Sequence, residues 1–180
     1  MNCSRCQKPA SVDLSTTGKL CMSCFCNIIE KRIRKGLRRQ NIKKGEVLVI
    51  KDTETPEGAM SLYILQKVLK NFPCTISSTG DHDRLIIPTN AEQEAATVLE
   101  CLFHHKPLPK AALKPLQHIL AEEVNLYVDY KKLSYSEALP KHPLTSVVQD
   151  IEKRYPGSLF SLLKSGATLA NLPELTSKST

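Results

Sequence analysis

The most constraining feature of the sequence is a group of four closely spaced cysteines near its N-terminus. Two CxxC pairs, Cys3 with Cys6 and Cys21 with Cys24, are separated by fourteen residues. Each pair can point two thiolates at one ion, and the intervening segment can bring the second pair round to complete a tetrahedron. So small a unit buries too little apolar surface to fold alone, and metal binding would supply its folding free energy. The spacing predicts a Zn²⁺-binding module of four cysteines over residues 1–27.

Other readings of the four cysteines are two disulfides, an iron–sulfur cluster or no site at all. Disulfides are typical of secreted chains, and the first residues show no continuous apolar segment of the kind found in a secretory signal. No apolar run approaches the roughly 20 residues of a membrane span. We therefore expect a cytoplasmic protein with no membrane partner.

A strongly basic segment follows the cysteines. Residues 30–44 carry eight basic side chains and a single acid, Glu30, and thus the whole net charge of +7. Such a local field attracts polyanions, and nucleic acid is the leading candidate. The alternative is a solvated helix face or a linker. The candidate nucleic-acid-binding residues are Lys31, Arg32, Arg34, Lys35, Arg38, Arg39, Lys43 and Lys44.

The rest of the 180 residues is long enough for one compact α/β domain. Hydrophobic periodicity predicts a helix over 28–39 within a basic linker (28–44), a buried strand at 47–50 and a helix over about 57–71. Two short strands follow, near 74–78 and 84–88. About five residues join them, too few for a parallel crossover, so if they pair they are antiparallel. Further helices are predicted near 91–105, 117–131, 143–155 and 158–166, and 171–180 is predicted to be a flexible tail. In the first of these helices, Val98, Leu99, Leu102 and Phe103 are expected to face inward.

Three segments resemble the tRNA 2-thiolation proteins of the PP-loop ATP pyrophosphatase superfamily. One is CxxCF at 21–25, which leads into the basic helix. Residues 89–99 (TNAEQEAATVL) resemble the family's TGHNxDDxAQTxL, and residues 114–157 contain, in the family's order, a PL pair, an EV helix with a tyrosine and a sequence similar to E-K-x-P-G. The resemblance implies a zinc-ribbon-like N-terminal module before a reduced, degenerate PP-loop (adenine nucleotide alpha hydrolase-like) domain over 45–170, with a helical C-terminal half and of archaeal type.

Departures from the family pattern concern its chemistry. Catalytic members carry SGGxDS after the first strand, where glycines and hydroxyls wrap pyrophosphate. The equivalent loop here spans residues 52–58, and only Thr53, Thr55 and Gly58 could still assist phosphate binding. Glu92 and Glu94 stand where TGHNxDD has its carboxylates, Ala-Leu-Pro at 138–140 replaces the family's CPY, and the catalytic cysteines have no counterpart, since Cys74 and Cys101 lie at other positions. The resemblance therefore implies a pseudo-enzyme without catalytic residues.

By this resemblance the chain would be the non-catalytic, tRNA-binding scaffold subunit for tRNA wobble-uridine 2-thiolation. Its partners would be tRNA and a catalytic PP-loop thiolase that receives sulfur from a ubiquitin-like carrier. Two other classes stay open. One is a zinc-containing nucleic-acid-binding regulator, and the other is a divergent nucleotide-binding enzyme that acts alone.

Overall fold

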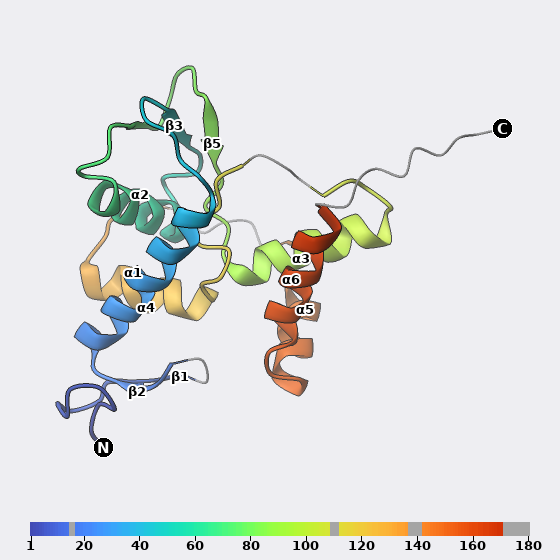
Figure 1. Ribbon diagram of the computed structural model, residues 1–180. Coiled ribbons are helices and arrows are strands. Elements are labelled where there is room, and N and C mark those ends of the chain that lie inside the picture. The colour runs from blue at the N-terminus through green and yellow to red at the C-terminus, as the bar shows by residue number, and fades with distance from the viewer. Residues whose placement is uncertain (15–16, 109–111, 137–141, 171–180) are drawn as a thin grey trace. The chain divides into compact units, whose positions relative to one another are not determined.

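The computed structural model describes residues 1–14, 17–108, 112–136 and 142–170. Contacts divide the chain into two compact units, which are not contiguous in sequence (Figure 1). The first contains residues 1–90 and 113–139, and the second contains residues 91–112 and 140–180. Both sheets and all four N-terminal cysteines belong to the first unit. Among the described residues, no helix combines the length and apolar character that crossing a membrane requires.

The first unit opens with a small hairpin that leads into a long helix. Strands β1 (Val12–Leu14) and β2 (Gly18–Leu20) pair antiparallel. Helix α1 (Met22–Arg39) begins directly after Cys21, six residues earlier than predicted, so the second CxxC pair is part of the helix start. Phe25, Ile29, Ile33 and Leu37 form its buried stripe, and their four-residue steps explain why this segment is an amphipathic helix.

The first unit contains a three-stranded parallel sheet. Its order is β4 (Thr75–Ser77), β3 (Val47–Ile50), β5 (Arg84–Ile86). Strand β3 pairs in parallel with both neighbours. The antiparallel pairing predicted for the two short strands is therefore wrong, because β3 lies between them.

The strand lengths explain this difference. The two outer strands have only three residues each. A link must cross two strand spacings, about 10 Å, and return about 10 Å along the strand direction. The six residues 78–83 can reach about 20 Å when extended. The rule that parallel crossovers need a dozen residues assumes strands of ordinary length.

Two helices complete the core of this unit. Helix α4 (Ala121–Lys131) packs against α1 and against α2 (Pro56–Val68) (Figure 1). Residue Leu113 bridges in parallel to Ile86, so the returning chain covers the outer edge of β5. The fully buried core side chains include Leu48, Ile50, Met60, Ile64, Leu65, Ile86, Leu113, Leu116, Val124 and Tyr127.

The second unit is helical. It contains α3 (Ala91–Phe103), α5 (Thr145–Arg154) and α6 (Ser158–Ala170), which pack against one another. Gly166 of α6 lies close to the Val98 side chain, which leaves no room there for a larger residue. Two large residues predicted to face inward, Leu102 and Phe103, are 42% and 66% exposed. The buried face of α3 is instead made largely of small residues, which a search for large apolar side chains overlooks.

The segment EKRYPG, residues 152–157, which resembles a family sequence, connects α5 to α6 in this unit. Oε1 of Glu152 accepts a hydrogen bond from Gly157 N at 2.7 Å, and Oε2 accepts one from Leu159 N at 2.8 Å. Gly157 has a φ of +93°, which favours glycine. The carboxylate thus caps the start of α6, and its negative charge suits the positive end of that helix.

Candidate metal centre and basic surface

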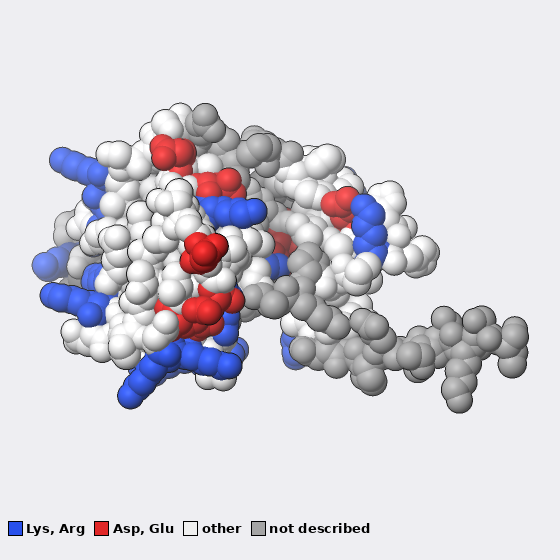
Figure 2. Space-filling view, turned by 90° about the horizontal axis from the view of Figure 1, so that it is seen from above, with Lys and Arg blue, Asp and Glu red and all other residues white. Residues whose placement is uncertain are grey.

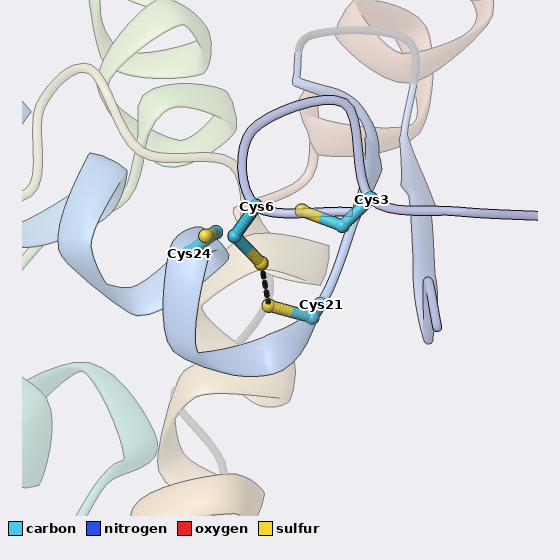
Figure 3. A group of neighbouring side chains, drawn as sticks. All are labelled: Cys3, Cys6, Cys21 and Cys24. Carbon is cyan, nitrogen blue, oxygen red and sulfur yellow. Dashed lines mark hydrogen bonds between the residues drawn. The ribbon is translucent and has the colours of Figure 1, made fainter. Parts of the chain in front are cut away.

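The four cysteines of the two CxxC pairs converge in the structure. Their Sγ atoms all lie within 4.8 Å of one another, and those of Cys6 and Cys21 are 3.5 Å apart. Figure 3 shows Cys3 and Cys6 on the N-terminal loop, facing Cys21 and Cys24 at the start of α1. Around a single tetrahedral zinc ion with Zn–S bonds of about 2.3 Å, sulfurs would be about 3.8 Å apart. The observed cluster matches the size of such a site.

Two of the four thiols have a lowered pKa, and a third has a raised one. The pKa of the Cys3 thiol is lowered to about 6, first because of backbone hydrogen bonding from Cys21, with a smaller contribution from Arg5. Backbone hydrogen bonding from Cys24 likewise lowers the pKa of Cys21. Side-chain hydrogen bonding with Cys6 raises the pKa of Cys24 to about 12. Thiolate is the form that binds metals, and a divalent ion among these sulfurs would favour it at all four positions.

The remaining cysteines lie apart from this cluster. Cys26 is 3% exposed, and burial raises the pKa of its thiol to about 11. Cys74 and Cys101 lie beside β4 and on α3. Within the described residues, the N-terminal four are the one group of cysteine, histidine or acidic side chains with metal-site geometry. A second cysteine site is therefore not seen in that part of the chain.

Seven of the eight predicted nucleic-acid-binding residues are exposed. Three of them, Lys31, Lys35 and Arg38, lie on one side of α1, opposite its buried stripe, because residues three, four and seven apart share a helix face. We call these three residues the basic stripe. The full exposed set is Lys31, Arg34, Lys35, Arg38, Arg39, Lys43 and Lys44. Among the described residues no acidic side chain forms an ion pair with any of the seven.

Charge is not spread evenly over the first unit. On the face shown in Figure 2, Lys and Arg side chains project from the margins of the larger body, and Asp and Glu side chains lie between them. Several acids within the fold also have assigned partners, such as Glu46 with Arg84 and Glu30 with Lys67. The cations of α1 are thus left to face solvent.

Arg32 is the exception among the eight. Its Nη1 atom lies 2.8 Å from Oε2 and 3.0 Å from Oε1 of Glu123, which is fully buried. The same Oε2 accepts a hydrogen bond from Leu120 N at 3.0 Å. Arg32 therefore joins α1 to the first turn of α4, and the structure does not place it among the solvent-facing cations.

In the loop predicted as a degenerate nucleotide site, polar groups form hydrogen bonds with one another. The Thr55 hydroxyl donates to Asp52 O at 2.8 Å and accepts from Gly58 N at 3.0 Å. Thr55 thereby caps α2, with Pro56 in the first turn. Thr53 is half-buried and its backbone lies against Gly58. The hydroxyl and N–H that would bind phosphate are thus engaged with each other.

Sequence reasoning missed one polar contact beside this loop. Asn90 donates from Nδ2 to Oε1 of Glu57 at 2.8 Å, and both side chains are buried. The signal lay in the segment TNAEQE, where Asn90 precedes α3. Glu92 and Glu94 lie in the first turn of α3, and the predicted counterpart of CPY at 138–140 lies outside the described residues.

Comparisons with known proteins show a similar fold. No family model and no curated protein sequence matches the chain. Among solved structures, it is similar to "U34-tRNA thiolase NcsA from Methanococcus maripaludis with its [4Fe-4S] cluster", with a TM-score of 0.77 and 18% sequence identity. The match covers 97% of this chain and 88% of the other. The predicted fold class, an α/β PP-loop-like domain after an N-terminal cysteine module, is confirmed.

The same comparison corrects one prediction. The chain was expected not to be an enzyme, because the SGGxDS loop and the catalytic cysteines of the family are missing. The solved structure that shares its fold over 97% of its length is an enzyme, a tRNA thiolase. The finding contradicts the pseudo-enzyme prediction.

Proposed function

We propose that this protein binds tRNA and acts in the 2-thiolation of the wobble uridine, together with a catalytic PP-loop thiolase chain. The observation that carries the proposal is a set of seven exposed cations, five on α1 and two just after it, that have no acidic partner among the described residues. The fold shared with a U34-tRNA thiolase supports tRNA as the polyanion.

Phosphate contacts by lysine and arginine side chains position a protein on RNA without reading bases. Each contact releases counterions from the nucleic acid, so affinity falls steeply as salt increases. The helix that carries these side chains is fixed from both sides. Arg32 binds Glu123 of α4, and Glu30 binds Lys67 of α2, both at 2.8 Å. The cations of α1 can therefore act as a rigid surface rather than as a flexible arm.

We propose zinc as the metal of the four cysteines. Sulfur atoms within 4.8 Å of one another fit a single tetrahedral ion. A four-iron cluster would place each sulfur on a separate iron and so spread the four further apart. Bound zinc would supply folding free energy to this module. The thiolase partner would receive sulfur from a ubiquitin-like carrier, so sulfur chemistry is not assigned to these four residues.

The first experiment measures tRNA binding by the whole protein at several salt concentrations. A triple variant, Arg34→Glu, Arg38→Glu and Arg39→Glu, should weaken binding by at least about 100-fold and reduce the salt slope by about 2–3. The matched control reverses three exposed cations of the second unit, Lys153, Arg154 and Lys164. Equal losses in both variants, or no tRNA binding by the wild-type protein, would refute the proposal.

A second experiment tests the partner. The tagged protein is purified from its own cells, and the proteins and RNA bound to it are identified. Recovery of a PP-loop thiolase with tRNA supports the proposal, and thiolation of tRNA is then assayed with this chain alone, with the thiolase alone and with both. Preference for duplex DNA over tRNA, without a thiolase, would instead favour a zinc-containing nucleic-acid-binding regulator.

A further inference from the structure

The metal centre lies at one end of the basic stripe. Cys24 precedes Lys31 by seven residues, and Lys31 precedes Arg38 by seven, so all three share one side of α1. At 1.5 Å per residue, the distance along the helix from Cys24 to Arg38 is about 21 Å. A nucleic-acid strand that follows the stripe towards the start of α1 must therefore meet the cysteine cluster.

The first CxxC knuckle, residues 3–8, covers this end of the helix. Its two sulfurs, those of Cys3 and Cys6, lie within 4.8 Å of the Cys24 sulfur (Figure 3). The loop is held in shape by a hydrogen bond from Cys3 N to Lys8 O at 2.7 Å, and Ser4 N binds Lys19 O on β2 at 3.0 Å. The knuckle therefore presents a fixed surface beside Cys24.

Two basic side chains project from that surface. Arg5 and Lys8 are exposed, and in the described part of the chain neither side chain has an acidic partner. The only acid among residues 1–27, Asp13, lies opposite Lys19 in the β1–β2 register. Within the described part of the chain, Arg5 and Lys8 thus form no ion pair with a carboxylate.

The metal explains why these two charges matter. A divalent ion with four thiolates carries a net charge of about −2, which repels phosphate. Two cations beside it cancel that charge and allow a polyanion to approach. Without them, the basic stripe would end at a negative centre.

We infer that Arg5 and Lys8 bind RNA phosphates as a continuation of the basic stripe, and that they do so only while the four cysteines hold their metal. The inference rests on the proposed tRNA binding and extends it to a site on the metal module. On this inference, two sets of contacts contribute to RNA affinity. One set is made by the cations of α1, and the other, made by Arg5 and Lys8, depends on the metal.

The test compares tRNA binding by the metal-loaded wild-type protein, by a double variant with Arg5→Ala and Lys8→Ala, and by a control with Lys153→Ala and Lys164→Ala. The knuckle variant should bind about 5- to 20-fold more weakly, with a salt slope smaller by about 1.4–1.8, which is the value for two lost phosphate contacts. The control should stay within twofold of the wild type. Equal affinity of the knuckle variant and the wild type overturns the inference.

Metal removal supplies the second arm. After chelation, wild-type affinity should fall, and the knuckle substitutions should then have no further effect. An equal loss with and without metal would overturn the dependence on metal. Metal content is measured for every variant, and Arg5→Gln with Lys8→Gln replaces the alanine pair if the latter loses metal. The exchange Arg5→Lys with Lys8→Arg should keep wild-type binding.

The two proposals fail in different ways. If the wild-type protein does not bind tRNA, the proposed function fails and the inference falls with it. If tRNA binding is lost on reversing the α1 charges but is unaffected by the knuckle substitutions, only the inference fails.

Discussion

Gly58 is the residue at which the loop between β3 and α2 leaves no room for a side chain. A Cβ atom there would lie 2.8 Å from the carbonyl carbon of Asp52, and closer still to its oxygen. We expect Gly58→Ala to lower the free energy of unfolding by about 3 kcal/mol, because the backbone must shift to relieve the overlap. Urea denaturation measures this.

Gly36 provides the matched control. It lies inside α1, and a Cβ there would meet nothing within 4 Å. Gly36→Ala should raise the free energy of unfolding by about 0.5–1 kcal/mol through helix propensity alone. A Gly58→Ala protein as stable as the wild type would show that the loop opens more readily than its hydrogen bonds indicate.

At the scale of single residues, local spacing was informative and charge alone was not. The four cysteines converge, as their spacing predicts, because two CxxC turns bring their sulfurs together locally. Arg32 was assigned to nucleic acid with its neighbours, although it pairs with Glu123, 91 residues away. Nothing in the segment that contains Arg32 distinguishes it from Lys31, since both are basic residues on a basic helix. The packing of α4 gives them different surroundings, since Arg32 contacts Glu123 and Lys31 faces solvent.

The ion pair between Arg32 and Glu123 connects two elements, and its loss should affect stability more than RNA binding. Arg32→Ala removes the arginine from its ion pair with a fully buried carboxylate, which should cost about 2–3 kcal/mol. The affinity of the folded protein for tRNA should stay within about twofold. Chemical denaturation and tRNA binding on the same sample test both statements.

Lys31→Ala is the control for this prediction. Lys31 is the exposed neighbour of Arg32, so its removal should leave the free energy of unfolding unchanged and weaken tRNA binding. The opposite pattern, with stability kept and RNA binding lost in Arg32→Ala, would show that Arg32 contacts RNA.

A second polar contact joins three helices and should make stability depend on pH. Glu30 on α1 accepts hydrogen bonds from Lys67 on α2 at 2.8 Å and from the Tyr127 hydroxyl on α4 at 2.9 Å. Burial raises the pKa of Glu30, but the bonds from Lys67 and Tyr127 outweigh it, and the pKa is lowered overall. A carboxyl whose folded pKa lies below its unfolded value stabilises the fold above the unfolded pKa, near about 4.3. That stabilisation is lost as pH falls through the folded pKa.

Urea denaturation between about pH 3 and pH 7 measures this effect. The wild-type free energy of unfolding should fall more steeply below about pH 4.3 than that of Glu30→Gln. Glu122→Gln, which changes an exposed carboxylate on α4, should keep the wild-type slope. Parallel curves for the wild type and Glu30→Gln would contradict the assigned role of Glu30.

At the scale of elements, hydrophobic periodicity predicted where helices and strands occur better than it predicted how they pack against one another. The strand at 47–50 and the helices over 91–103 and 145–154 lie close to where the sequence placed them. The order β4-β3-β5 could not be predicted from loop length, because strands of three residues need so little chain to return. The inward face of α3 was also misjudged, because its partners lie on α5 and α6 and accept small residues.

At the scale of the whole molecule, the fold class was predictable from the sequence. The division of the chain into two compact units was harder to predict. Segments at 89–99 and 114–157 carried the family resemblance, and the solved thiolase structure confirms the fold class. The chain leaves the first unit after residue 90 and returns at 113, a step that periodicity along the sequence does not reveal. The pseudo-enzyme prediction was wrong. It judged the activity of the protein from the altered loop at 52–58 and from the absence of the family's catalytic cysteines.

Loss of the metal should unfold the N-terminal module and leave the rest of the molecule folded. Cys3→Ser removes one ligand, and we expect release of the ion and unfolding of about residues 1–27, because binding supplies the folding free energy of such small modules. Cys21 and Cys24 lie at the start of α1, so its first turn should unfold with them. The helix beyond should persist, since Ile29, Ile33 and Arg32 are fixed by buried contacts.

Metal analysis and hydrogen exchange measured on each segment test this prediction. One zinc per wild-type chain, no visible absorbance, and loss of protection confined to the N-terminal module are expected. Cys74→Ser, which changes a cysteine outside the cluster, should keep both metal and protection. Iron, sulfide and a broad visible absorbance would instead identify an iron–sulfur cluster. Unfolding of the whole protein in Cys3→Ser would show that the module stabilises the α/β unit as well, because the loss would then extend through α1 into the core that it shares with α4.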